Sequence, residues 1–281
     1  MFQRLTNSWE LVKASWRVLL ADKELMVFPV IAFFASLVVM VTFAVPTVLA
    51  GVLATAITNG DVGIFSYVVA FLFYAVMYFV TIFFNSALVG AAMIRLEGGD
   101  PTVRDGLRIA TSKLGTIFGY AVIAATVGTI LRAISERSGT IGRIVVSLVG
   151  FVWNIATFLV VPVLVVENVG PLEAVKRSGS LLKETWGEQI AGNLSVGVIF
   201  GLITFGVILL GIPLVILAVL SGSVALVVTA VALVILLIMA VSLVSSTLSG
   251  IYTAAVYRYA TTGDTGGYFD ADMVKGAFKL K

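Results

Sequence analysis

The fold is decided by residues 189–257, which read QIAGNLSVGVIFGLITFGVILLGIPLVILAVLSGSVALVVTAVALVILLIMAVSLVSSTLSGIYTAAVY without one charged side chain. About 20 helical residues cross the hydrocarbon core of a bilayer, so 69 residues are too many for a single span. The turn-forming Ser221-Gly222-Ser223 lies near the middle of the stretch. The sequence therefore predicts a helical hairpin, with spans at about 190–220 and 224–258.

Four shorter stretches are also free of charge, and each is long enough to span a membrane: 25–60, 62–94, 114–131 and 144–166. A spanning segment must satisfy its backbone hydrogen bonds internally, which favours helices at about 25–56, 64–94, 114–132 and 144–166. Of the 281 residues, 60% are apolar and 12% charged, against about 45–50% and about 25% in soluble domains. We predict an all-α integral membrane bundle of six transmembrane helices, in one membrane domain over 1–281.

The basic residues orient these spans. Cytoplasmic loops of membrane proteins carry an excess of Lys and Arg. With six spans, one side of the membrane holds the two ends of the chain and two of the loops, and with them 15 of the 18 basic residues. The other side holds only Arg132, Arg137 and Arg143. Pro213 offers a further break and a seven-span alternative, but that would move the basic C-terminal end outside. We therefore predict six spans in the cell membrane, with both ends cytoplasmic.

Three amphipathic segments precede the first, third and fifth spans and share a pattern of acid, aliphatic, base and small residue. They begin at Glu10, Asp105 and Glu173. Asp100-Pro101 and Gly170-Pro171 place a proline at the predicted start of the second and third helices. This pattern predicts three repeats of an interfacial helix plus a hairpin, over about 1–94, 95–166 and 167–260, with a cytoplasmic tail at 261–281. The alternative is that any amphipathic helix on a membrane surface converges on such a pattern, without an internal repeat.

Tryptophans mark these interfacial helices. Indole rings favour the membrane–water boundary, where an apolar ring and a polar edge are both accommodated. Trp9 and Trp16 belong to an apolar stripe at helical spacing in the first segment, and Trp186 lies on the apolar face of the third. We expect Trp9, Trp16 and Trp186 to be interfacial anchors that contact membrane lipids. Packing of the first stripe on the protein's own loops is the alternative.

The two ends of the chain carry a family resemblance. The opening includes Ser8-Trp9-Glu10-Leu11, Asp22-Lys23-Glu24-Leu25 and Phe28-Pro29, and the ending runs from Tyr252 to Gly263 and on through Gly267-Tyr268-Phe269-Asp270. Together they resemble a family of uncharacterised prokaryotic multi-pass membrane proteins. The resemblance covers the whole chain and implies the six-span fold and cytoplasmic ends, but no activity. A weaker likeness links the chain to the membrane region beside glycerophosphodiester phosphodiesterases, whose soluble catalytic barrel has no counterpart in these residues.

Composition excludes several kinds of chemistry. The chain has no Cys and no His, which removes thiol nucleophiles, imidazole catalysis and His-based zinc sites. The acidic residues Glu97, Asp100 and Asp105 could hold a divalent ion, but helix capping explains them better. We predict no catalytic, cofactor-binding or metal site, and expect the protein not to be an enzyme. The net charge of +3 reflects cytoplasmic loops and not nucleic-acid binding.

What remains are small and polar residues within the spans. Glycines recur along the fifth helix and allow close helix contact: Gly192, Gly197, Gly201, Gly206 and Gly211. Packing within the bundle is one reading of this face, and contact with a membrane protein partner or a second copy is the other. Asn85, Asn154 and Ser245 could line a polar cavity or join helices. We favour a non-enzymatic scaffold or accessory subunit, with a channel or transporter for a neutral or lipidic solute and a lipid-modifying enzyme as alternatives.

Overall fold

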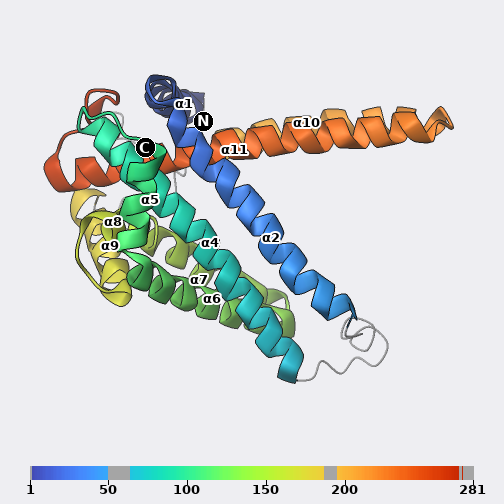
Figure 1. Cartoon of the computed structure of the whole chain (residues 1–281), viewed down its shortest axis with the longest axis horizontal. Helices are drawn as coiled ribbons and strands as arrows, with labels where there is room; N and C mark the ends of the chain where they lie inside the picture. The colour runs from blue at the N-terminus through green and yellow to red at the C-terminus, as the bar shows by residue number, and fades with distance from the viewer. Residues whose placement is uncertain (1, 50–63, 187–194, 272–273, 275–281) are drawn as a thin grey trace.

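The computed structural model describes residues 2–49, 64–186, 195–271 and 274, and every regular element within these ranges is helical (Figure 1). The elements in chain order are α1 Phe2–Ala21, the short 3-10 helix η1 Lys23–Met26, α2 Val27–Leu49, α4 Ile64–Leu96, α5 Val103–Ser112, α6 Leu114–Arg137, α7 Thr140–Ala156, α8 Val160–Val166, α9 Pro171–Trp186, α10 Ser195–Leu220 and α11 Val224–Thr262.

The six predicted spans are confirmed as helical segments long and apolar enough to cross a membrane. They cover Lys23–Thr47, Val68–Leu96, Leu114–Arg137, Thr140–Val166, Val196–Leu220 and Val224–Thr262. Pro213 lies inside α10 without ending it, and the chain turns at Gly222, whose φ is +69°. Six candidate spans among the described residues are the pattern of a multi-pass membrane protein, and the break at Pro213 that seven spans would require does not occur.

The fourth span differs from the prediction because it is broken. It consists of α7 and α8, with an irregular turn at 157–159 between them. Pro162 is the physical reason, since its ring would clash with the carbonyl of Phe158 in a continuous helix. The amide N–H of Leu159 at the break donates to the Ser178 hydroxyl of α9 at 3.0 Å. A side chain from another helix therefore satisfies the interrupted backbone.

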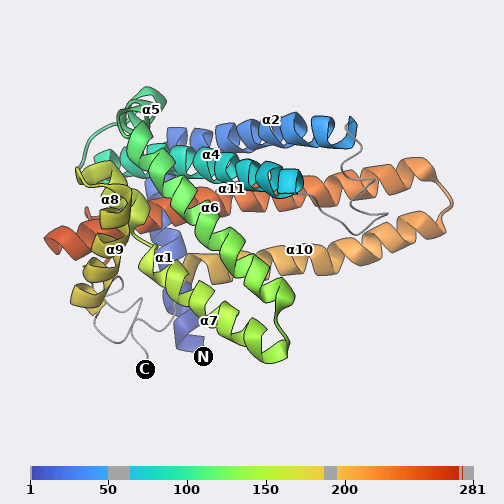
Figure 2. The ribbon, with the colours of Figure 1, turned by 90° about the horizontal axis from the view of Figure 1, so that it is seen from below.

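The spans diverge instead of closing into one compact bundle. Figures 1 and 2 show the α10–α11 hairpin extending far beyond the other helices. The central element is α4, which contacts α2, α5, α6, α8 and α11, whereas α10 packs mainly on α11 and α1. In each span, between 6% and 28% of the most apolar window is buried inside the chain. Most of this apolar surface is therefore left for lipid or for another protein.

The core gathers at one end of the spans, the end at which α1, α5, α8 and α9 all lie (Figure 2). We call this end the base of the molecule. Its buried side chains come from the C-terminal halves of α4 and α11 and from the shorter helices, including Leu88, Leu164 and Ile251. Gly106 of α5 allows a close approach to α4, since a Cβ there would lie 2.6 Å from the Ala87 carbonyl oxygen.

The three amphipathic segments lie in α1, α5 and α9, each of which precedes a span. Pro171 begins α9 as predicted, but Pro101 does not begin α5. The N-cap of α5 is Thr102, whose side chain and backbone exchange hydrogen bonds with Asp105 in a capping box. These hydrogen bonds hold the pKa of Asp105 below its ordinary value.

Candidate functional site

A groove runs beneath α1, where this helix crosses α10 and α11. Figure 1 views α1 nearly along its axis while α10 and α11 run across the page, so α1 lies across them at the base. The groove has a volume of about 640 Å³. Its apolar wall comes from three helices that are far apart in the sequence, and the residues are Trp9, Val12, Trp16, Phe200, Ile203, Val244 and Leu248.

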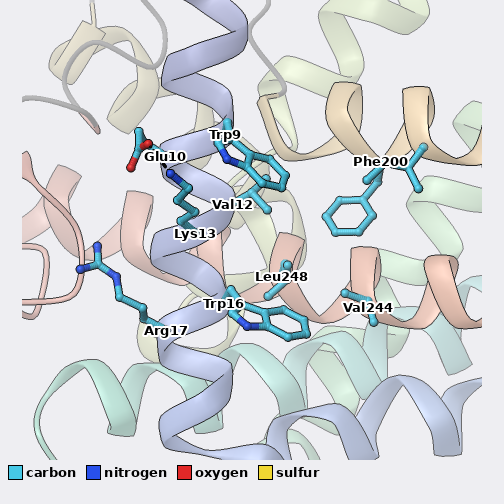
Figure 3. A pocket seen from close by; sticks show the side chains of 10 residues that line it. Trp9, Glu10, Val12, Lys13, Trp16, Arg17, Phe200, Val244 and Leu248 are labelled. Atoms are coloured by element: carbon cyan, nitrogen blue, oxygen red, sulfur yellow. Dashed lines mark hydrogen bonds and ion pairs between the residues drawn. The ribbon is translucent and has the colours of Figure 1, made fainter.

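Side chains divide around α1 according to their chemistry. Figure 3 shows the rings of Trp9 and Trp16 on the side that faces Phe200 and Val244. Glu10, Lys13 and Arg17 project from the opposite side and complete the lining along its edge. The amphipathic pattern of α1 therefore places two indoles towards the spans and the charges away from them.

The predicted anchors Trp9 and Trp16 keep much of their surface uncovered, at 44% and 40% exposed. Leu11, Val12 and Leu19 of the same helix are buried in the base. The apolar surface of α1 is therefore shared between the protein core and the groove. An aromatic ring left half exposed beside apolar spans is placed to meet acyl chains.

Trp186 occupies a different environment, although the sequence treats the three tryptophans alike. It is only 5% exposed, and its ring stacks at a tilt on Tyr259, 6.0 Å away between centroids. Its indole N–H donates to the Val274 carbonyl at 3.4 Å. Such a side chain has almost no surface to offer to lipid, so the expected anchoring role is left to Trp9 and Trp16.

This difference gives a direct prediction for fluorescence quenching by lipids brominated on their acyl chains. Single-tryptophan chains that keep only Trp9 or only Trp16, with Phe at the other positions, should be quenched strongly after reconstitution, because both rings border apolar spans. A chain that keeps only Trp186 is the matched control, and its emission should change little. Equal quenching in all three chains would contradict this placement.

Gly197 and Gly201 are exposed on one face of α10, whereas Gly206 lies on the opposite side of the helix. Among the described residues, a Cβ built at any of these three glycines meets no atom within 4 Å, whereas at Gly211 it would meet the Val234 side chain of α11 at 2.8 Å. Gly192 lies outside the described residues. The closest glycine contacts inside the chain are instead at Gly106, Gly250 and Gly266, which no motif in the sequence distinguished.

Some of the polar residues predicted for a cavity do come together. A smaller pocket of about 170 Å³ between α2, α4 and α11 is lined by Asn85, Ser246 and Ser249, among others. Ser245 is not part of its lining, and Asn154 is exposed on α7. The three residues named in the sequence therefore do not form a continuous polar path.

Charged residues at the base form ion pairs between loops and helix ends. Arg95 at the end of α4 contacts Asp22 at 3.5 Å and Asp100 at 2.7 Å. Arg258 at the end of α11 pairs with Asp264 at 2.7 Å and holds the pKa of this carboxyl below its ordinary value. Glu97 pairs with Arg258, and Asp105 with Arg108. The acidic residues considered for a divalent ion are thus each engaged by an arginine.

Metal ligation finds no support in the part of the chain that the structure describes, where no group of three or more acidic side chains could hold an ion. The same acids have structural roles: Glu97 joins the α4–α5 loop to the end of α11, and Asp100 joins that loop to α4. The arrangement at the base therefore fixes helix ends, whereas the α1 groove and the face of α10 at Gly197 and Gly201 are left uncovered by the described residues.

Comparison with known proteins gives a family and no activity. No curated protein matches the chain. A family model described as a family of unknown function (DUF6159) matches residues 64–268, which include five of the six candidate spans and end just beyond the Arg258–Asp264 pair. Since this match covers well over half of the chain, the protein belongs to the family of unknown function DUF6159.

Proposed function

We propose that the protein is a non-enzymatic, multi-pass membrane scaffold or accessory subunit. The observation that carries this proposal is the open face of α10 at Gly197 and Gly201, which are exposed and meet no other part of the chain that the structure describes. Small residues allow two membrane helices to approach closely. The face suits a helix of a membrane protein partner or of a second copy of this chain.

The arrangement of the spans supports the same proposal. The α10–α11 hairpin projects from the base with its apolar side chains uncovered (Figure 1). A surface of this kind is covered in a membrane by lipid or by another protein. The base carries most of the basic residues, which favours its placement, with both chain ends, on the cytoplasmic side of the cell membrane.

The test replaces Gly197 and Gly201 together by leucine. Overpacking costs on the order of 1–3 kcal/mol, which corresponds to partner binding weaker by about 5- to 150-fold. The thermal stability of the chain itself should not fall, because no described residue would contact a Cβ at these positions. Partner retention in mild detergent would be measured by affinity purification with mass spectrometry, and oligomeric state by light scattering.

Gly211→Leu is the matched control on the same helix. Its side chain would collide with Val234 inside the chain, so it should lower thermal stability and leave partner retention intact. A double variant that keeps every partner and its oligomeric state would overturn the scaffold proposal. Loss of neutral-solute uptake in that variant would point to transport instead.

Transport of a neutral or lipidic solute is the second candidate, and the pocket of Asn85, Ser246 and Ser249 favours it. Within the described residues, these three side chains make no hydrogen bond to another group. Polar groups within a membrane need partners, which a solute could supply. This pocket has a volume of about 170 Å³, and no continuous polar path joins the polar residues named in the sequence. Transport is therefore the second candidate after the scaffold.

A further inference from the structure

The groove beneath α1 combines an apolar surface with a positively charged edge, and a ligand with an apolar chain and an anionic head would need both. Its depth is apolar and formed by Trp9, Trp16 and the side chains of α10 and α11, while its edge carries Lys13 and Arg17. We propose that this groove binds one phospholipid with a net anionic headgroup, whose acyl chain lies against the indoles and whose phosphate lies beside Lys13 and Arg17. The proposal does not depend on the scaffold function.

Shape and position favour an acyl chain. The groove volume of about 640 Å³ lies in the range of about 300–1,000 Å³ that is typical of small-molecule sites. Ile203 is part of the lining and is 40% exposed, so the groove opens onto the outer surface of α10. Phe205, farther along that helix, is exposed as well. An elongated apolar ligand would therefore pass from the groove onto a surface that is itself apolar.

Charge favours a phosphate at the other end of the ligand. Lys13 and Arg17 are four residues apart on one face of α1. Lys13 pairs with Glu10 at 2.8 Å, and Arg17 donates to the Tyr268 carbonyl at 3.0 Å. Two cations beside one carboxylate leave this edge positive, and a guanidinium has five N–H donors, of which the Tyr268 carbonyl takes one.

The orientation of α1 places the apolar depth of the groove and its charged edge at the levels of the acyl chains and of the headgroups. The spans α10 and α11 run away from the base, and α1 lies across them (Figures 1 and 2). The indoles of α1 thus point along the direction of the acyl chains, and the cations point towards the headgroups. Lysine and arginine reach phosphates in this way while their methylene stems cover apolar surface.

The test measures lipid retained by the full chain. The protein would be reconstituted into vesicles of equal parts phosphatidylglycerol and phosphatidylcholine, extracted in mild detergent, and examined by native mass spectrometry. We expect one phosphatidylglycerol to stay bound. Lys13→Gln with Arg17→Gln should lower this retention about 25-fold, since each cation near the surface contributes about fivefold. Lys183→Gln with Arg104→Gln removes two exposed cations elsewhere and should have no effect.

A second pair of variants tests the groove without changing charge or disturbing the core. Ile203→Trp fills the groove from its open edge and should abolish retention of the lipid. Leu202→Trp, on the neighbouring exposed position outside the lining, should not. Retention of phosphatidylglycerol in Ile203→Trp, equal retention of phosphatidylcholine by the natural chain, or a bound polypeptide in place of lipid would each overturn the proposal. None of these outcomes bears on partner loss at Gly197 and Gly201.

Discussion

Arg95→Gln is expected to destabilise the chain by about 3 kcal/mol at pH 7, because it leaves a buried carboxylate without its cation. The side chain of Asp22 is 4% exposed and that of Arg95 is 17% exposed, with 3.5 Å between Arg95 Nε and Asp22 Oδ2. Arg95 also donates to the Ala21 carbonyl at 3.2 Å. One side chain of α4 thus holds the junction between α1 and η1, and its loss should loosen both. The measurement is thermal unfolding in mild detergent, followed by tryptophan fluorescence.

The pH dependence of this variant identifies the mechanism. Burial raises the pKa of Asp22 above its ordinary value, and the Arg95 guanidinium opposes this rise. A carboxyl with a raised pKa stabilises the fold at pH values below its unfolded pKa, and this contribution is lost as the pH rises through its folded pKa. Without Arg95 the pKa rises further. The stability difference between the variant and the natural chain should therefore shrink as the pH is lowered from 7 towards 4.

Two comparisons check that the buried charge is responsible. Asp22→Asn in combination with Arg95→Gln should recover part of the lost stability, since it removes the uncompensated carboxylate. Arg108→Gln breaks an ion pair whose arginine is 74% exposed and should cost less than about 1 kcal/mol. An Arg95→Gln chain as stable as Arg108→Gln would show that the pair does not hold the junction.

Gly106→Ala should produce the next largest loss of stability. The added methyl group would lie 2.6 Å from the Ala87 carbonyl oxygen and against the ring of Phe28, so α5 must move away from α4. Overpacking costs about 1–3 kcal/mol, and more where backbone is in the way, which outweighs the gain of about 1 kcal/mol in helix propensity. The expected fall in unfolding temperature is about 5 °C.

Gly115→Ala on α6 is the control, because a Cβ there meets nothing within 4 Å. It should leave the unfolding temperature unchanged or raise it slightly through helix propensity. If Gly106→Ala behaves in the same way, α5 does not pack closely on α4.

The spans were predictable because they depend on composition along the chain. Charge-free length located four spans and the long stretch that holds the other two, and the turn residues Ser221-Gly222-Ser223 divided that stretch. The fourth span was predicted as one helix at about 144–166, but the structure breaks it at 157–159, whereas Pro213 lies inside the continuous helix α10. The difference lies in tertiary structure, because the Ser178 hydroxyl of α9 accepts a hydrogen bond from the Leu159 amide, and no local sequence pattern predicts this contact.

For the candidate sites, the sequence gives the types of residue but not their surroundings in the fold. The sequence shows that Gly106, Gly197 and Gly250 are glycines, but the fold decides which of them meets a neighbour. Trp186 has the same local pattern as Trp9, because an amphipathic helix has the same periodicity whether lipid or protein covers it. Val274 and Tyr259 contact Trp186 in the fold. The groove itself needs three helices that are distant in sequence, so no window of sequence could contain it.

The position of α1 has a consequence for biosynthesis. About 170 residues separate Ala21 from Ser195, so α1 leaves the ribosome long before α10 and α11, which it will cross. At about 5–20 residues per second this delay is roughly 10–35 s. Throughout that interval α1 can pack on η1 and α4, but Trp9 and Trp16 lack the groove wall that α10 and α11 supply. The final hairpin therefore inserts beside a helix that is already in place, and the groove beneath α1 is completed only in the last step of synthesis.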